Sequence, residues 1–420
     1  MRSAFAKSIA LLVLLALAPP VPAEAEEPSA APKKETEKGK SQTFDPTIAK
    51  RVNRALDEMQ AQRYDVARDV LETINFRRAK PYEVSRVEQV YAAIDQSQEK
   101  YGSAREHLGR ALASGGLDPK EASAIRFQMA KLLLAEERWA EGVASLEEWF
   151  ALESDPNSAA YYVLAVAQYQ IQDLEKAVAS AQKAVDLAGS RPDTSWLQLL
   201  LALRLKREEY DLAYPVLLGL IERQPQQKNY WVQASSAALS GGDYDNATAL
   251  LQVARTGDLL TEEKEIRSLA GLLIFRGIPH RAALLLEQAI ADKRLTADAE
   301  SYELLGNCWI AARDYGKAVE PLTRAGELGG TGEPYLRLAE VYSQQEKWPD
   351  AVDALRHGID KGNLKRGGLA ELLMGIAYFN QRKIPEARTW FQRAAAHREQ
   401  KMQAEAWLTH ADNALAAGRT

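Results

Sequence analysis

The chain has 420 residues, of which 46% are hydrophobic and 26% charged, so it can bury a large core and has the composition of a soluble protein. The formal net charge is -5 and no basic cluster is present, which argues against nucleic acid as a partner. Cys308 is the only cysteine, so an intramolecular disulfide is excluded.

The first 23 residues have the layout of a secretory signal peptide. Arg2 and Lys7 precede an apolar run over residues 9–18, and a proline pair leads to a small-residue site at Ala23. The run is too short to cross a bilayer of roughly 30 Å. We expect cleavage after Ala23, or alternatively after Ala25, and a periplasmic mature protein without a transmembrane segment. An uncleaved anchor is the alternative, which the proline pair disfavours.

Residues 24–43 are expected to form a flexible linker. They are rich in Pro, Ala, Lys and Glu and offer almost nothing to bury, so they cannot offset the entropy lost on ordering. A charged docking tail is the alternative. Because residues 1–23 hold two basic and no acidic residues, their removal takes the net charge from -5 to -7.

From residue 44 onward one short pattern recurs: a large residue, a small residue three places later and a large apolar residue four places after that. In AARDYGKAVEPLTRA, residues 311–325, these are Tyr315, Ala318 and Leu322. We call the small residue the anchor. Its interval of 33 to 38 residues predicts one repeated unit and a continuous solenoid over residues 44–398. The anchors are Ala67, Ala104, Gly142, Ala177, Ala213, Ala247, Ala282, Ala318, Ala351 and Ala387.

Each unit is predicted to be two antiparallel helices. Upstream of Ala318, the residues Tyr302, Leu305, Gly306 and Trp309 fall at i, i+3, i+4 and i+7, on one face of a first helix. Strand-like alternation is absent. A small anchor lets the second helix approach the first. The sequence thus predicts an all-α solenoid of about ten helix-turn-helix units, with residues 399–420 as a C-terminal capping helix.

The signature residues of this unit resemble the tetratricopeptide repeat, and the resemblance covers about residues 45–398. Gly142, Gln168 and Pro279 depart from the usual pattern, since an alanine or an aromatic residue is expected at these places. The resemblance implies a right-handed solenoid that binds other proteins along its inner groove.

The resemblance also implies which residues line that groove. Tyr162, Val166 and Tyr169 follow i, i+4 and i+7, so they form either a contact surface for a partner or packing against the neighbouring unit. The similar trio Leu372, Ile376 and Phe379 is expected beneath the capping helix. The implied groove residues are Phe127, Lys131, Tyr162, Val166, Tyr169, Gln198, Val232, Glu303, Asn307, Leu336 and Glu340.

No catalytic, cofactor-binding or metal-binding pattern stands out. The histidines are scattered among units and are interpreted as surface residues: His107, His280, His357, His397 and His410. Asp243 is interpreted as a helix N-cap rather than part of a calcium loop, and LGGTGEPYL, residues 328–336, as a turn. We therefore expect neither enzymatic activity nor a cofactor, unless Glu303 and Glu340 converge on a deep pocket.

A more specific resemblance covers nearly all of the mature chain. The segments that carry it are residues 146–178, 228–239, 272–290, 301–322 and 333–352. They are similar to the periplasmic tetratricopeptide proteins encoded beside TonB, ExbB and ExbD. This similarity implies a non-catalytic accessory of the TonB energy-transducing system for outer-membrane receptors, with the periplasmic domain of TonB or ExbD as partner. The alternative is an assembly factor for envelope polysaccharide or outer-membrane proteins.

Overall fold

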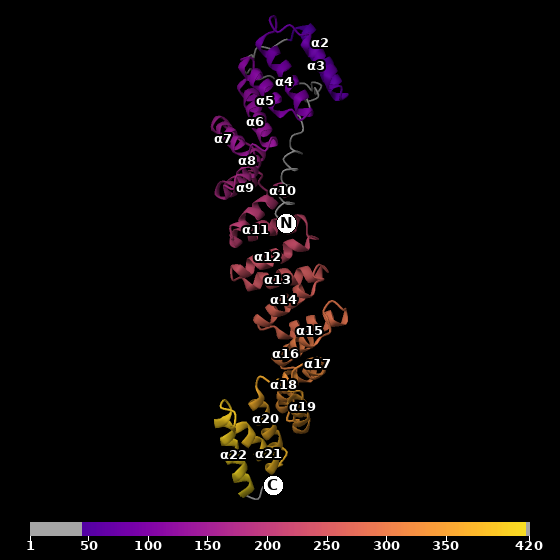
Figure 1. Cartoon of the computed structure of the whole chain (residues 1–420), viewed down its shortest axis with the longest axis vertical. Helices are drawn as coiled ribbons and strands as arrows, with labels where there is room; N and C mark the ends of the chain where they lie inside the picture. The colour runs from indigo at the N-terminus through magenta and orange to yellow at the C-terminus, as the bar shows by residue number, and fades with distance from the viewer. Residues whose placement is uncertain (1–43, 417–420) are drawn as a thin grey trace, which may run out of the picture. The chain divides into compact units, whose positions relative to one another are not determined.

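The computed structural model describes residues 44–416, whose regular elements are 21 α-helices without a strand (Figure 1). The predicted all-α repeat fold is confirmed for this part of the chain. The predicted signal peptide and linker, residues 1–43, lie outside the described residues, as do residues 417–420. No helix among the described residues is long and apolar enough to cross a membrane.

The chain divides into two compact units, with unit 1 ending at Glu209 and unit 2 beginning at Tyr210. Unit 1 contains α2 (Pro46–Gln60), α3 (Tyr64–Glu72), α4 (Pro81–Ser97), α5 (Tyr101–Ala113), α6 (Pro119–Ala135), α7 (Trp139–Leu152), α8 (Ser158–Gln170), α9 (Leu174–Leu187) and α10 (Thr194–Lys206). Unit 2 contains α11 (Tyr210–Arg223), α12 (Lys228–Ser240), α13 (Tyr244–Thr256), α14 (Glu263–Phe275), α15 (Pro279–Ala291), α16 (Ala299–Ala311), α17 (Tyr315–Leu328), α18 (Glu333–Gln344), α19 (Trp348–Lys361), α20 (Gly367–Asn380), α21 (Ile384–Ala395) and α22 (Lys401–Ala416).

Within each unit, successive helices pack against one another as antiparallel pairs. The first helix of a repeat is here called helix A, and the second, which carries the anchor, helix B. Helices α2 to α9 make four A–B pairs in unit 1, and α12 to α21 make five in unit 2. The fifth repeat contributes its helix A, α10, to unit 1 and its helix B, α11, to unit 2.

Each A–B turn contains one residue with left-handed backbone, five positions before the anchor. The N–H of the following residue donates back to the carbonyl five residues earlier, as Asp314 does to Trp309 at 2.9 Å. This is the geometry with which helices commonly end at glycine. Here only two of the ten residues are glycines: Gln62, Glu99, Glu137, Gln172, Glu208, Gly242, Gly277, Arg313, Glu346 and Arg382.

Within each unit, the anchors are buried where helix B packs closely against helix A. All nine alanine anchors are fully inaccessible to solvent. Gly142 departs from alanine for a packing reason, since a Cβ atom there would lie 2.2 Å from a methyl carbon of Leu134. Helix A has its own small position: a Cβ atom on Gly306 would lie 2.7 Å from Leu322. Small residues on both helices thus let the large apolar residue fit between them.

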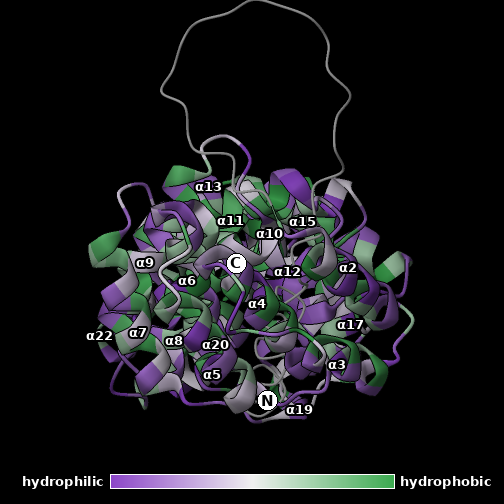
Figure 2. Cartoon of the chain, turned by 90° about the horizontal axis from the view of Figure 1, so that it is seen from above, coloured by the Kyte–Doolittle hydropathy of each residue, from purple (hydrophilic) through white to green (hydrophobic). Residues whose placement is uncertain are grey.

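The helix starts follow the sequence-based interpretation. The Asp243 side chain accepts a hydrogen bond from the N–H of Asn246 at 3.0 Å, so the predicted N-cap is confirmed. Pro279, Pro349 and Pro385 stand in the first turn of their helices, where a missing N–H costs little. The helices of both units carry hydrophilic as well as hydrophobic residues (Figure 2).

Helix α22 packs on the last A–B pair of unit 2. The Trp407 ring stacks on Phe391 with centroids 5.6 Å apart and meets the edge of Phe379 at 5.5 Å. Ala404 and Ala411 are fully buried on the same helix. Phe379 therefore lies against α22, as the sequence predicts.

Candidate functional site

The eleven predicted groove residues lie on A helices, at three positions that recur 15, 11 and 8 residues before the anchor. Unit 1 carries Phe127 and Lys131 on α6, Tyr162, Val166 and Tyr169 on α8, and Gln198 on α10. Unit 2 carries Val232 on α12, Glu303 and Asn307 on α16, and Leu336 and Glu340 on α18.

For two of these residues, the prediction that they line the groove is wrong. Val166 and Leu336 are fully inaccessible, so neither offers side-chain surface to a partner. The segment around Val166 is buried on all sides, from Val163 to Gln168, because α8 is enclosed by its neighbours. The apolar stripe predicted along α8 is therefore interrupted at its centre, and only its two tyrosines remain partly exposed.

The two tyrosines of α8 pack against the next A helix while retaining partial exposure. The Tyr162 ring stacks on Trp196 of α10, with centroids 5.8 Å apart. Burial raises the pKa of Tyr162 against the opposing effect of a hydrogen bond with Ser195. The Lys206 ammonium of α10 lies 5.0 Å from the centroid of the Tyr169 ring. Contact with the neighbouring repeat thus orients both rings and limits their rotamer freedom.

Helix α6 adds an aromatic ring and a cation in the same register. Phe127 packs against Trp149 of α7 at 4.7 Å, and the Trp149 indole N–H donates to the Ser123 hydroxyl at 2.8 Å. The Lys131 ammonium lies 5.5 Å from the Phe127 ring centroid, and burial lowers the pKa of Lys131. No described carboxylate forms a salt bridge with this lysine, so its charge is only partly compensated within the chain. Gln198, on α10, is exposed.

The predicted groove residues of unit 2 are more polar. Val232, Glu303 and Asn307 are partly exposed. Glu340 accepts a hydrogen bond from Arg366 at 3.1 Å and lies 3.9 Å from Arg337, so arginines compensate its charge. No hydrogen bond or ion pair among the described residues joins Glu303 to Glu340, and the convergence that an acid–base pair needs is not found there.

One histidine was misassigned from the sequence. The His107 side chain is 12% exposed and lies between two carboxylates on α4, with Nδ1 2.6 Å from Glu88 and Nε2 3.6 Å from Asp95. Its ring stacks on Tyr91 at 4.9 Å. The Arg68 guanidinium forms an ion pair with Asp95, which has no exposed surface. The other four histidines are exposed, as predicted.

The sequence holds a signal for this polar cluster. Asp95 stands nine residues before its anchor, the position held by Trp309 and Tyr378 in other repeats. Gln168 and Arg204 occupy the same position in unit 1, and both are buried and hydrogen-bonded. Polar residues in place of a core aromatic therefore mark buried hydrogen-bonded side chains of the repeat core, although the Arg204 Nε atom has no hydrogen-bond partner among the described residues.

The Cys308 thiol is poorly suited to nucleophilic chemistry. Burial raises the pKa of the Cys308 thiol to about 11, and the residue is 1% exposed, so its thiolate is disfavoured. Within residues 44–416, no group of three or more histidine, cysteine or acidic side chains is arranged to hold a metal ion.

Comparison with known proteins identifies the repeat. The tetratricopeptide repeat family matches residues 127–192 in unit 1 and residues 336–405 in unit 2. These two stretches of the protein are tetratricopeptide repeats. The two matched stretches include α7 to α9 and α19 to α21, so the Tyr162–Tyr169 face and the pair beneath α22 both belong to matched repeats. Tetratricopeptide repeats generally mediate contacts between proteins.

Several solved structures have limited similarity to this chain. A MamA crystal structure is 23% identical, with TM-score 0.34, over 40% of this chain and 96% of that one. YrrB, described as a TPR protein with an unusual peptide-binding site, is 16% identical, with TM-score 0.34, over 43% of this chain and 88% of that one. PilF from Pseudomonas aeruginosa is 18% identical, with TM-score 0.34, over 50% and 91%. No curated protein has significant sequence similarity to the chain.

Proposed function

We propose that the protein is a non-catalytic scaffold that holds another protein on the A-helix face of unit 1. The observation that carries this proposal is the arrangement of Phe127, Lys131, Tyr162 and Tyr169. Phe127 and Tyr162 stand at equivalent positions of the consecutive A helices α6 and α8. Lys131 and Tyr169 lie on the same two helices, and all four residues are partly exposed. Neighbouring side chains hold their rings, so little rotamer entropy is lost when a partner binds. Aromatic residues held in this way are typical anchors of protein interfaces.

The charge of this face favours a partner with acidic or aromatic groups. Lys131 is half-buried without a carboxylate partner among the described residues, and burial lowers its pKa. A carboxylate from a partner would compensate the charge of this ammonium, which burial has partly removed from water. The tyrosine hydroxyls add hydrogen-bonding groups beside apolar rings.

The specific setting that we propose is the periplasm, as an accessory of the TonB–ExbB–ExbD system. Two features of the sequence support it: the secretory layout of residues 1–23, and the similarity of residues 146–178 and 301–322, among others, to tetratricopeptide proteins encoded beside those genes. In this proposal the partner is the periplasmic domain of TonB or ExbD, and the scaffold organises the complex for transport through outer-membrane receptors.

Calorimetry with the purified protein and each isolated periplasmic domain tests the proposal. We expect binding with a Kd of about 1 μM or tighter, corresponding to roughly -8 kcal/mol. The variant Tyr162→Ala/Tyr169→Ala should weaken it. A matched control is Tyr210→Ala/Tyr244→Ala, which removes two exposed tyrosines at the starts of B helices in unit 2.

The outcomes separate the partner from the face. Binding weakened by the first variant alone supports both. If both variants bind equally tightly, the assignment of the partner stands, and the assignment of the binding site to the unit 1 face is rejected. Absence of binding to either domain would reject the TonB assignment and favour the envelope-assembly alternative.

A further inference from the structure

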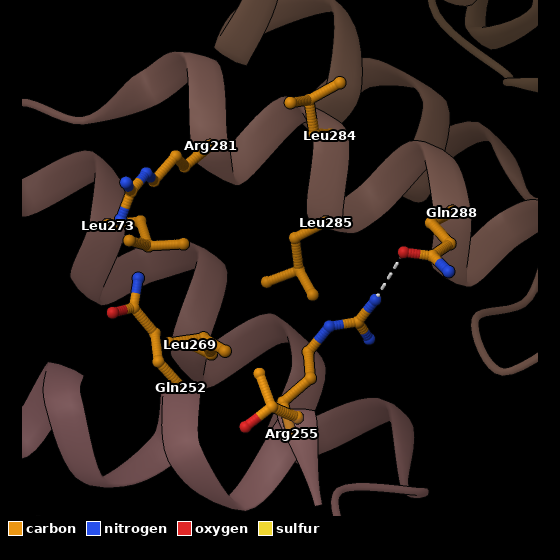
Figure 3. A pocket seen from close by; sticks show the side chains of 9 residues that line it. Gln252, Arg255, Leu269, Leu273, Arg281, Leu284, Leu285 and Gln288 are labelled. Carbon is orange, nitrogen blue, oxygen red and sulfur yellow. Dashed lines mark hydrogen bonds between the residues drawn. The ribbon is translucent and has the colours of Figure 1, made fainter. Parts of the chain in front are cut away.

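Unit 2 has an open cavity of about 360 Å³ between three consecutive helices, α13, α14 and α15. Its floor consists of Leu269 and Leu273 from α14 and Leu285 from α15 (Figure 3). Leu284 adds an apolar side chain that is 45% exposed. This volume lies at the lower end of the range for ligand-binding pockets, so the cavity can hold one or two side chains of a partner.

The cavity is distinct from the face proposed above. On α14, the positions 15 and 11 residues before the anchor, which hold Phe127, Tyr162 and Lys131 in unit 1, are Arg267 and Gly271, two residues before Leu269 and Leu273. Two residues correspond to about 200° around a helix, so the leucines belong to the opposite side of α14. The remaining lining residues come from the B helices α13 and α15.

Two arginines flank the leucine floor from different helices, Arg255 from α13 and Arg281 from α15 (Figure 3). The lining contains no acidic residue. Arg255 donates a hydrogen bond to the neutral amide oxygen of Gln288 at 2.9 Å, and neither arginine forms a salt bridge with a described carboxylate. Nearby arginines differ in this respect, since Arg294 pairs with Asp258 at 2.5 Å.

The environment of Arg255 indicates uncompensated positive charge. Burial lowers its pKa, and the neighbouring Arg294 acts in the same direction, against the smaller opposing effects of Asp292 and Asp258. A carboxylate placed against the Arg255 guanidinium would therefore relieve an existing electrostatic cost. The floor would at the same time favour an aliphatic group beside that anion.

We propose that this cavity is a second docking site, which binds an acidic polypeptide segment with an aliphatic side chain on the leucine floor and flanking carboxylates on Arg255 and Arg281. A polypeptide fits better than a fatty acid because the cavity is open to solvent. Gln252 and Thr256 in the lining offer hydrogen bonds to a peptide backbone. Such a site would let one chain hold two partner segments at once, with the gain in affinity that bivalent binding gives.

The test uses the purified full-length protein and a short fluorescent peptide in which glutamates alternate with leucines. Its N-terminus is acylated by the dye and its C-terminus is amidated, so side chains supply the only carboxylates. Fluorescence anisotropy should detect saturable binding that weakens with added salt. Arg255→Gln and Arg281→Gln should each raise the Kd about tenfold, the effect of losing one charge-assisted hydrogen bond. Leu284→Ser should also raise it.

Three controls make the result specific. Arg324→Gln removes an exposed arginine on α17, outside the cavity lining, and should leave the Kd unchanged. Tyr162→Ala/Tyr169→Ala should also leave it unchanged, which separates this site from the face in unit 1. Replacing the peptide glutamates with glutamines should abolish binding.

The proposal is overturned if the glutamate peptide does not bind, or if it binds the double variant Arg255→Gln/Arg281→Gln as tightly as the unaltered protein. Competition by decanoate at least as strong as competition by the unlabelled peptide would overturn the polypeptide assignment in favour of a small aliphatic acid. Circular dichroism of every variant checks that the helices remain folded.

Discussion

At the scale of single residues, glycines reveal where the repeat depends on close packing. A Cβ atom on Gly375 of α20 would lie 2.4 Å from the Phe391 ring, which is fully buried. A Cβ atom on Gly271 of α14 would have no neighbouring atom within 4 Å. The two residues share a unit and a helical backbone, so they differ mainly in the space around them.

We predict opposite effects of alanine at these two glycines. Gly375→Ala should lower the free energy of unfolding by about 1–2 kcal/mol, because overpacking outweighs the gain in helix propensity. Gly271→Ala should raise it by roughly 0.5–1 kcal/mol, because only the gain remains. Urea unfolding measures both, and stabilisation by Gly375→Ala would contradict the packing geometry.

The buried polar cluster of unit 1 gives a pH-dependent prediction. Burial favours the neutral form of Glu88, but hydrogen bonds from His107 and Arg110 outweigh it and lower its pKa below the usual 4.5. A lowered pKa means that Glu88 stabilises the fold fully above about pH 4.5, and that this contribution is lost as the pH falls through the folded-state value.

Glu88→Gln should therefore destabilise the protein by about 1–3 kcal/mol at pH 7 and by less at pH 3. Chemical unfolding at both pH values measures the difference. Glu106→Gln, an exposed change on α5, is the matched control and should have little effect at either pH. Equal losses at both pH values for Glu88→Gln would show that its charge is not the stabilising feature.

Residue-level prediction from the sequence succeeded for small core positions and was incomplete for exposure. The anchors were predicted because size is a property of the residue itself and recurs with the period. Val166, Leu336 and His107 were misplaced because their exposure depends on how neighbouring helices cover them. The period alone does not specify that coverage.

At the scale of elements, the A–B turn is the most regular feature of the chain. Eight of the ten repeats place a non-glycine residue in the left-handed backbone region there, at a cost that glycine would avoid. Spacing predicted the location of these turns, but their backbone strain was not visible because glutamate, glutamine and arginine are not typical of left-handed positions.

Arg313→Gly should therefore stabilise the protein by about 0.5–1 kcal/mol, since relief of the left-handed strain exceeds the added entropy of the unfolded chain. Arg324→Gly, in the interior of α17 in the same repeat, should instead cost about 1 kcal/mol. Thermal unfolding of the pair tests the assignment. If both changes destabilise the protein, the Arg313 side chain itself contributes to the stability of the fold.

At the scale of the whole molecule, a repeat protein is held by contacts between neighbouring elements. The steady interval between anchors in the sequence predicted the number of repeats and the pairing of their helices. The division at residues 209 and 210 did not, because the spacing continues across it from Ala177 through Ala213 to Ala247. Boundaries between compact units depend on which helix faces meet, and a period carries no such information.

Nearest-neighbour stability predicts a local effect of disrupting α22. Trp407→Ala removes the ring that packs on Phe391 and Phe379, and should cost about 2 kcal/mol or more. Hydrogen exchange should accelerate at least about tenfold in α20 and α21 and stay unchanged in α12 and α13 of the same unit. Uniform acceleration throughout unit 2 would instead indicate one cooperative block.

The measurement that tests the central claim most directly is hydrogen exchange of the protein with and without a saturating periplasmic domain of TonB or ExbD. A scaffold that binds through the unit 1 face should gain protection in α6, α8 and α10, around Lys131, Tyr162 and Tyr169, and lose that gain in the Tyr162→Ala/Tyr169→Ala variant. Protection confined to other helices, or none at saturating concentrations of both domains, would contradict the account.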